Sequence, residues 1–569
     1  MIYKKNYFIP VNLKKIKKVD GVVYNISRNL NTYPPYFQNV VIKYPKKKLQ
    51  NDEFNYISKL TNRIFNNLYL NLNNILGTKN SKKYWKIIIY PWLTDFVHGT
   101  YFKYLQLKKI EKKKMNFFVN DKILNHKKYL NNYHTYVDYD DKFHYMIYLD
   151  ISKYFNNFNY FNSNLKFFSK KKIENKEKNL LQKFDVLIND FQQIFVKNAP
   201  LINDSFLSRK NLIKFSIKNN FLRISDNYEF QEIEYKKSKI DFFKKDKLFK
   251  DIKSNNKFEN IIFQLIKKTL PSLFLESFLS NSKKILKKNI LKNKPKFVLT
   301  ANSYWSNIVF QINLAELSRY NVPIFILQHG GQFDILKMLP ERDFIFDIAD
   351  KFLTIGNKNI FQKKYRKKII QIGYPKKIVN LKNISKKYIL LSITTRPMFV
   401  YRLQSQMAGP QYDEYLNRIF DFLKNLDKQT RSRIIIKHHN SDQDLNFNLK
   451  IKKSYPEIRY SSDKNIFNLF SKCSLHIGTW LSTVEFESIM MGIPTLIINF
   501  DEYQDFTILG KKFLKKFEKL KIYFNGLPKN NDKKKLLINI IKNNKVKSSK
   551  QAMNELKKSF NIKFNNLTL

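Results

Sequence analysis

The sequence predicts an α/β protein with two Rossmann-like domains and a helical N-terminal elaboration. Two stretches carry this prediction, residues 297–332 and residues 473–499. In each of them an apolar strand, a helix, a second strand and polar turns follow one another at the spacing of a parallel βαβ unit. The chain of 569 residues is long enough for about two to four domains, each with a buried core.

Composition excludes several classes of protein. Hydrophobic residues make up 43% of the chain, which excludes wholesale disorder. The net charge of +59 would ordinarily indicate nucleic acid or an anionic membrane as a partner. The excess is almost all lysine, spread through a chain with only 12 glycines, as a strong A+T coding bias would produce. We therefore expect no nucleic-acid partner, and at most a peripheral contact with an anionic membrane.

The single cysteine and the distribution of apolar residues bear on the compartment. Cys473 alone excludes a disulfide framework and a thiolate zinc site, and it favours a reducing cytoplasm. The N-terminus lacks the apolar run of a signal peptide. No stretch approaches the roughly 20 apolar residues that a membrane helix needs. We expect a cytoplasmic protein, and any association with the inner face of the cytoplasmic membrane would be peripheral.

The chain divides into three segments. Residues 1–375 are predicted to form the N-terminal Rossmann-like domain with helical insertions, residues 376–530 the C-terminal one, and residues 531–569 a helical tail. Within the first segment, residues 51–130 have the pattern of helices, and we expect one of them to be interrupted near Pro91.

The first segment also contains an Asp-x-Asp pattern within residues 137–141, superficially like one that holds a divalent metal in some glycosyltransferases. Three letters in a loop rich in Asn, Asp and Tyr are too unspecific, so we predict no metal site.

The unit at 473–499 has a polar turn at the C-terminal end of its first strand, where ligands bind in parallel sheets. Ser482 and Thr483 begin its helix, and the N–H groups and hydroxyls of a helix start are suited to hold a phosphate. Glu487 lies one turn further along, in an otherwise apolar segment, where its carboxylate could accept two sugar hydroxyls. The alternative is structural, because Ser482 and Glu485 have the spacing of a capping box. A capping box leaves Glu487 unexplained, so the pattern favours a nucleotide-sugar site.

Polar residues follow other predicted strands as well. Gln328, His329 and Gly330 come directly after an apolar strand, and a histidine in that setting favours acid–base chemistry or a phosphate contact over a structural role. Arg396 follows the first strand of the C-terminal domain, where a surface loop charge is the equal alternative. His438 ends the next strand, in a position to face a phosphate.

Three motifs resemble those of a family of bacterial surface-polysaccharide transferases with the GT-B glycosyltransferase fold. That family joins an N-terminal Tyr-Trp-Arg-Ile-x-x-Gly-Pro-Trp-Leu motif to Gln-His-Gly-Gly and a late Ser-Thr-x-x-Leu-Glu. Here residues 84–93 read Tyr-Trp-Lys-Ile-Ile-Ile-Tyr-Pro-Trp-Leu, residues 328–331 read Gln-His-Gly-Gly, and residues 482–487 read Ser-Thr-Val-Glu-Phe-Glu. Lysine at the arginine position keeps the charge but loses the bidentate fork.

The resemblance implies a GT-B-like fold, with two Rossmann-like domains facing a cleft. It further implies transfer of a sugar, or of a related nucleotide-activated group, from a nucleotide-sugar donor to a glycan or lipid-linked glycan acceptor in surface polysaccharide biosynthesis. The donor would bind the C-terminal domain and the acceptor the N-terminal one. No metal and no cofactor would be needed.

These implications give each candidate residue a role. Ser482 and Thr483 would bind the donor phosphate, and Glu487 the ribose or the donor sugar. Arg396 and His438 would be supporting donors for the charge that accumulates on the leaving phosphate.

In the N-terminal domain, His329 would be the catalytic base that deprotonates the acceptor hydroxyl, with Gln328 and Gly330 contributing to binding. Two other classes stay open, namely a nucleotide-sugar epimerase of the same architecture and a non-enzymatic, basic scaffold that binds glycan or lipid.

Overall fold

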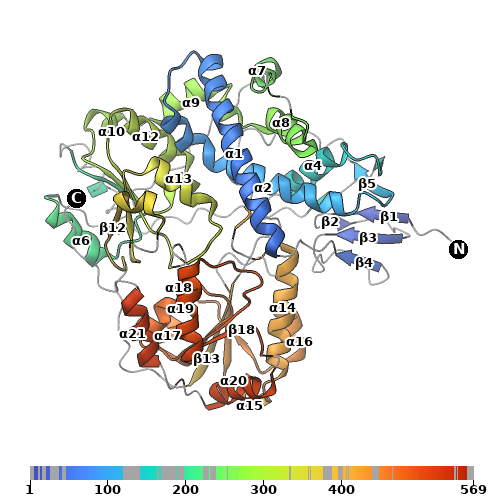
Figure 1. Ribbon diagram of the computed structural model, residues 1–569, viewed down its shortest axis with the longest axis vertical. Helices are drawn as coiled ribbons and strands as arrows, with labels where there is room; N and C mark the ends of the chain where they lie inside the picture. The colour runs from blue at the N-terminus through green and yellow to red at the C-terminus, as the bar shows by residue number, and fades with distance from the viewer. Residues whose placement is uncertain are drawn as a thin grey trace.

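The computed structural model shows an α/β protein with three parallel β-sheets in its described residues (Figure 1). We call them the first, second and third sheet in chain order, and we call residues 1–375 the N-terminal half and residues 376–569 the C-terminal half. The structure describes residues 5–9, 13–15, 21–25, 38–41, 47–119, 141–162, 166–167, 187–188, 198–221, 230, 239–250, 252, 254–286, 288–331, 333, 335–356, 358, 361–375, 387–394, 402–404, 407, 409–438, 447–463, 465–528, 530–543, 546 and 549–559.

The first sheet has the strand order β4-β3-β1-β5-β6, and all of its pairs are parallel. A separate antiparallel pair joins β2 to β7. The elements of this region are β1 (Lys5–Phe8), β2 (Leu13–Lys15), β3 (Gly21–Asn25), β4 (Gln38–Val41), α1 (Lys47–Leu76), α2 (Lys82–Lys109), β5 (Met115–Val119), α4 (Asp141–Ser152), β6 (Phe158–Asn162) and β7 (Lys166–Phe167).

This first sheet corrects part of the prediction for the N-terminal region. Residues 51–130 were expected to be helical throughout, yet they contain β5. After α2 the chain turns, and the short run ending in Phe117, Phe118 and Val119 pairs with β1 and β6, which are distant in sequence. The N-terminal elaboration is therefore a further α/β unit.

Helix α2 runs without a break through Pro91, so the predicted interruption there is wrong. Proline removes one i→i−4 hydrogen bond and ordinarily ends or kinks a helix. Here α2 is buried along most of its length and packs against α1, α12 (Ile308–Arg319) and α13 (Pro340–Ile348). Contacts such as the hydrogen bond from Trp85 Nε1 to Asn73 Oδ1 at 2.9 Å hold it in place. Tertiary packing thus offsets the lost bond.

The second sheet has the order β12-β11-β10-β9-β8 and is also wholly parallel. The C-terminal ends of its strands lie at one edge and point toward the C-terminal half (Figure 1). Besides α12 and α13, the elements of this region are β8 (Leu201–Asn203), α6 (Arg209–Lys218), α7 (Phe242–Lys247), α8 (Lys257–Thr269), η2 (Ser272–Phe274), α9 (Phe278–Ile285), α10 (Lys288–Lys292), β9 (Val298–Thr300), α11 (Ser303–Ser306), β10 (Ile324–Leu327), β11 (Lys351–Thr354), η4 (Lys363–Lys368) and β12 (Ile369–Gln371).

The third sheet has the order β15-β14-β13-β16-β17-β18, again parallel throughout. Its direction of winding reverses between β13 and β16, and such a switch point opens a crevice at the C-terminal strand ends. The elements are β13 (Tyr388–Ile393), α14 (Gly409–Lys424), α15 (Lys428–Ser432), β14 (Ile434–His438), α16 (Phe447–Ser454), β15 (Arg459–Tyr460), α17 (Ile466–Phe470), β16 (Cys473–Gly478), α18 (Thr483–Met490), β17 (Thr495–Asn499), α19 (Ile508–Lys519), β18 (Tyr523–Asn525), α20 (Asn531–Asn543) and α21 (Ser549–Ser559).

The two halves meet at the C-terminal edges of the second and third sheets. Gly331 N, in the turn after β10, donates to Thr483 Oγ1 at the start of α18 over 3.1 Å. Beside this contact, Leu336 and Phe506 form an antiparallel bridge between the halves. The strand tips of two parallel sheets therefore face each other, as the GT-B-like prediction requires. None of the described helices is long and apolar enough to cross a membrane.

Candidate functional site

The start of α18 lies at the switch point of the third sheet. Ser482 caps the helix: its Oγ accepts from Val484 N at 3.3 Å, and its own N–H donates to Glu485 Oε2 at 2.7 Å. The capping box proposed from the spacing is therefore confirmed. The capping box explains the local conformation of Ser482. It does not explain Thr483 or Glu487, which make other contacts.

Glu485 does more than cap the helix, which sequence reasoning missed. Its side chain is buried over β16, where Gly478 leaves the space, because a Cβ on Gly478 would overlap the carboxylate. Ser392 Oγ, at the end of β13, donates to Glu485 Oε1 at 3.2 Å. Burial, only partly opposed by these hydrogen bonds, raises the pKa of Glu485 to about 7. The carboxyl thus bridges β13, β16 and α18 at the switch point.

A buried histidine continues this polar chain. His476 Nε2 lies 2.9 Å from Ser392 Oγ, and its Nδ1 lies 2.8 Å from Ser488 Oγ. Ser488 Oγ is in turn 2.8 Å from Thr495 Oγ1 on β17. Burial lowers the pKa of His476 to about 3, so the imidazole is neutral at pH 7. This chain of hydrogen bonds joins β13, β16, α18 and β17.

Two glycines allow the halves to touch. Gly330 has φ +83°, and a Cβ there would lie 3.0 Å from Thr483 Oγ1. A Cβ on Gly331 would overlap the ring of Phe486. The Gln-His-Gly-Gly turn therefore lies directly on the N-terminal turn of α18, which explains why glycine occupies both positions.

Gln328 shapes this turn from below. Its Oε1 accepts from Thr354 Oγ1 at 2.5 Å and from Ile355 N at 3.1 Å, and its Nε2 donates to Gly330 O at 2.9 Å. Only 3% of Gln328 is exposed, so in this structure the side chain supports the turn. The neighbouring His329 is exposed, with its ring centroid 4.6 Å from that of Phe206.

Glu487 is buried between the halves. Tyr374, in the Gly-Tyr-Pro segment after β12, donates its hydroxyl hydrogen bond to Glu487 Oε1. Burial, followed by the charge of Glu487, raises the pKa of Tyr374 above its ordinary value. The structure therefore gives Glu487 a partner within the chain. Sequence reasoning had no signal for this partner, which lies more than a hundred residues away.

Two predicted residues remain to be considered. Arg396 falls outside the described residues. His438 ends β14, next to β13, and its ring lies parallel to that of Tyr460 at a centroid separation of 6.3 Å. The structure thus brings Gln328, Gly330, Thr483 and the start of α18 together and leaves His438 one strand further along the edge.

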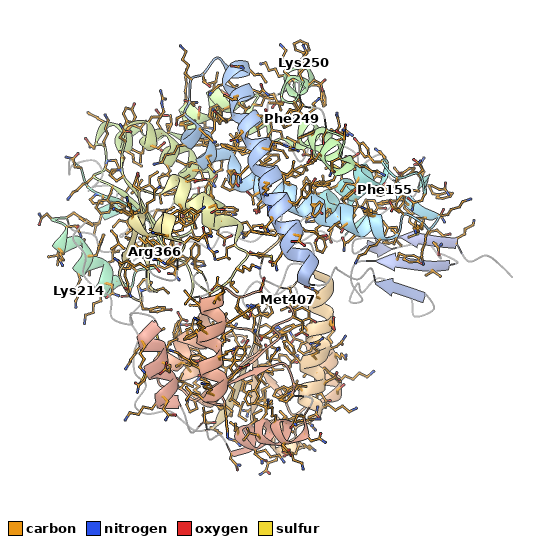
Figure 2. All side chains as sticks on the ribbon, in the orientation of Figure 1. Phe155, Lys214, Phe249, Lys250, Arg366 and Met407 are labelled. Atoms are coloured by element: carbon orange, nitrogen blue, oxygen red, sulfur yellow. The ribbon has the colours of Figure 1, made fainter. Side chains whose placement is uncertain are left out.

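Arg402 is a connection that sequence reasoning missed. It follows β13, as Arg396 does, but reaches the N-terminal half, where its Nε lies 3.4 Å from Asp95 Oδ1 and its Nη1 lies 3.5 Å from Glu341 Oε2. Its guanidinium lies over the Trp305 ring at 5.0 Å. Met407, further along the same loop, lies where the two halves meet (Figure 2). Asp95 follows the first motif by two residues, the one available signal.

The chemistry of the site is set by the polar groups that lie at the contact between the two sheets. Within the described residues, no group of three or more His, Cys, Asp or Glu side chains is placed to hold a metal ion. The groups that face one another are instead hydroxyls, backbone N–H groups of a helix start and an exposed imidazole. These can bind an anion and exchange a proton.

The chain is similar to one family of known proteins and, at low sequence identity, to several solved structures. The sequence profile of the LIC12162 family transferases matches residues 29–528. Acinetobacter baumannii MurG is 12% identical with a TM-score of 0.30, over 50% of this chain and 74% of MurG.

Two further solved structures resemble the chain at the same level. The wall teichoic acid polymerase TagF is 13% identical with a TM-score of 0.28, over 48% of this chain and 70% of TagF. The spinosyn rhamnosyltransferase SpnG is 11% identical with a TM-score of 0.28, over 49% and 73%. No curated protein matches the chain.

Proposed function

This chain belongs to the LIC12162 family of transferases, and on that basis we propose that it is a glycosyltransferase of bacterial surface polysaccharide biosynthesis. It would move a sugar, or a related nucleotide-activated group, from a nucleotide donor to a glycan or lipid-linked glycan acceptor without a metal. One observation carries the proposal: the C-terminal edges of two parallel sheets face each other, with α18 starting at the switch point of one and His329 exposed on the other.

The donor nucleotide would bind at the start of α18. The Thr483 hydroxyl accepts from Gly331 N, which leaves its own O–H free to point at a phosphate oxygen. The first N–H groups of α18 add partial positive charge. Glu487 would bind the ribose or the sugar, since its carboxylate lies beside the start of α18 at the contact between the halves, next to Tyr374.

The acceptor would lie against the second sheet. His329 is the proposed base, because its exposed imidazole stands at a strand end, two residues before the Gly331 that contacts the start of α18. A base from one half and a phosphate site from the other would bring acceptor and donor together. Exclusion of water by the contact between the halves would limit hydrolysis of the donor.

The test is a thermal-unfolding screen with CMP, UDP, GDP and dTDP. A nucleotide at 100 times its Kd should stabilise the wild type by about 2.7 kcal/mol. Glu487→Gln keeps the size of the side chain and an acceptor for Tyr374, yet should lose much of that stabilisation. Glu518→Gln, at an exposed position on α19, is the matched control and should respond like the wild type.

The outcomes separate the alternatives. Stabilisation by no nucleotide, with all proteins folded, would replace the proposal by a non-enzymatic scaffold. Nucleotide release from a nucleotide sugar that requires added acceptor would support the transferase. Conversion of free nucleotide sugar without an acceptor would support an epimerase instead.

The proposal includes a peripheral contact with an anionic membrane, and α7 is the surface that fits it. Phe242 and Phe243 are 57% and 70% exposed on this short helix at the periphery of the N-terminal half (Figure 1). Residues 239–250 hold five lysines against two aspartates, and Lys250 lies beside α7 at the same periphery (Figure 2). Exposed aromatic rings among lysines suit the interface of an anionic bilayer.

A further inference from the structure

A short loop crosses the C-terminal edge of the second sheet and contacts His329. We call residues 204–208 the strap. At its start, Asp204 O accepts from Ala301 N, just after β9, at 2.9 Å. At its end, Ser208 N donates to Pro375 O, just after β12, over 3.1 Å. Between these ends, the ring of Phe206 lies against the imidazole of His329. The strap therefore runs over the strand end that carries the proposed base.

The strap adopts a backbone conformation that its residues disfavour. Asp204 has φ +53° and Phe206 has φ +57°, both in the left-handed region. Aspartate tolerates this region, but a bulky aromatic residue there is an outlier. Such a conformation persists only where surrounding contacts determine it, and it occurs most often at functional sites.

The surrounding contacts are specific and polar. Asn203 Nδ2 donates to Ser303 Oγ at 2.7 Å, and Ser303 Oγ donates to Asp204 Oδ2 at 3.3 Å. At the other end, Asn211 Nδ2 donates to Pro375 O at 2.8 Å. Both ends of the strap are thus tied to fixed neighbours, and the positive φ of Phe206 follows from where the two ends are held.

Packing alone does not explain where the Phe206 ring lies. The strap buries Ser205 and Leu207, and Leu207, with 8% exposure, belongs to the core on one face of the second sheet. Phe206 is only half-buried at the margin of that core. The ring therefore packs partly against that core and partly against the imidazole of His329.

The geometry points to Phe206 as a positioning residue: held by the strap, its ring limits rotation of the His329 side chain and presents the imidazole to the crevice between the halves. This inference rests on the proposed role of His329 as the base. A catalytic base must stand within hydrogen-bond reach of the proton that it removes, and a misplacement of about 1 Å can cost about 100-fold in rate.

The test reads the His329 ring directly and needs no substrate. The full chain is labelled with ¹³C-histidine, and the His329 signals are assigned by their absence in His329→Gln. The ring current of Phe206 should shift these signals in the wild type. Phe206→Leu should move them toward the position of an unstacked histidine, and Phe206→Tyr should restore them.

Matched variants separate positioning from stability. Phe221→Leu removes a ring packed against the same core, where it contacts Phe215 and Phe297, and should leave the His329 signals in place. Phe206→Asn removes the ring but suits a left-handed backbone, so it supplies a folded variant if Phe206→Leu unfolds. Unchanged His329 signals in both Phe206 variants, or an equal change in Phe221→Leu, would overturn the inference.

Turnover distinguishes this inference from the proposed function. The donor in this assay is the sugar derivative of the nucleotide that stabilises the protein. With it, Phe206→Leu should lower kcat by about tenfold or more and leave the KM for the donor little changed. Full activity of His329→Gln would refute the role of His329 as base, whatever the spectra show. Loss of activity in His329→Gln with wild-type kcat in Phe206→Leu would refute the role of Phe206 alone.

Discussion

Glu485 shows how one side chain can fix the geometry of a crevice. Its carboxylate accepts from Ser482 N on one side and from Ser392 Oγ on the other, and both donors stand at the switch point of the third sheet. The space for it exists only because Gly478 has no side chain. A group at this place controls the direction in which the first N–H groups of α18 point.

The raised pKa of Glu485 predicts a pH-dependent contribution to stability. Its pKa is about 7 in the folded protein against 4.5 in the unfolded chain. Its stabilising contribution is therefore fully present below about pH 4.5 and is lost as the pH rises through 7, by up to about 3 kcal/mol. Glu485→Gln cannot ionise and should lack this loss. Denaturant unfolding of both proteins between pH 5 and pH 8 measures the difference.

A neighbouring group acts in the opposite direction, so the comparison must be made between variants. The pKa of His476 is lowered to about 3, and its contribution is present above pH 6.5 and lost as the pH falls through 3. His476 remains in both proteins, so its effect cancels to first order. Parallel loss of stability in the wild type and Glu485→Gln between pH 5 and pH 8 would contradict the assignment.

Among the elements, α18 has contacts with both halves. Its first turn supports the third sheet through the capping box, while Thr483 and Glu487 contact the N-terminal half through Gly331 and Tyr374. A helix with contacts on both sides transmits a shift of one half to the proposed phosphate site of the other. The contact between the halves therefore combines these buried polar groups with an apolar cluster to which Leu336, Phe486 and Phe506 belong.

Removal of the Tyr374 hydroxyl tests that contact. Tyr374→Phe keeps the ring but removes one hydrogen bond to the buried Glu487 carboxylate, and a hydrogen bond to a charged group contributes about 1.5–3 kcal/mol. Tyr455→Phe is the control, because Tyr455 is comparably buried in the core of the C-terminal half and should change little. Denaturant unfolding gives both values. Equal effects of the two substitutions would mean that the hydroxyl of Tyr374 contributes nothing.

The elements that could be predicted from the sequence are those with local signals. β16, α18 and β17 carry an apolar run, a capping box and a Gly-x-Pro stop, and β10 runs into the Gln-His-Gly-Gly turn. The first sheet could not be predicted as a sheet, because the pair that joins its two parts, β1 with β5, brings together Tyr7 and Asn116, which are far apart in the sequence. The continuity of α2 through Pro91 likewise depends on neighbours that no local pattern names.

The same division applies to the candidate site. The grouping of the Gln-His-Gly-Gly turn with the start of α18 follows from a rule for parallel sheets and was predictable. The contacts of Glu487 with Tyr374 and of Arg402 with Asp95 and Glu341 join distant segments, so spacing gave no signal for them. Glu485 was predicted only as part of a cap, because its burial depends on the space above Gly478.

At the scale of the whole molecule, the two halves are fastened at more than one place. Arg402 binds two carboxylates of the N-terminal half, while Lys337 N donates to Asp505 O at 2.9 Å and Thr507 N donates to Ile335 O at 2.8 Å. Movement of one half against the other must break or stretch these contacts. Access to the crevice is therefore coupled to charge pairs and backbone bonds outside it.

The charge of the whole molecule leads to the last prediction, which concerns the membrane. A chain with a net charge of +59 is attracted nonspecifically to any anionic surface, so charge alone cannot identify a docking face. An apolar contribution can identify one. Phe242→Ser/Phe243→Ser should weaken binding to vesicles of phosphatidylcholine and phosphatidylglycerol by about tenfold or more, because both rings leave water on docking. Ile508→Ser/Leu509→Ser removes two exposed apolar side chains from α19 in the other half and should bind as the wild type does.

Vesicles of phosphatidylcholine alone should bind weakly, and added salt should weaken binding to the anionic vesicles by screening the lysines. Equal binding by the two double variants would show that attraction is general and would remove α7 as the docking surface; failure of the wild type to bind either vesicle would remove the membrane as its partner.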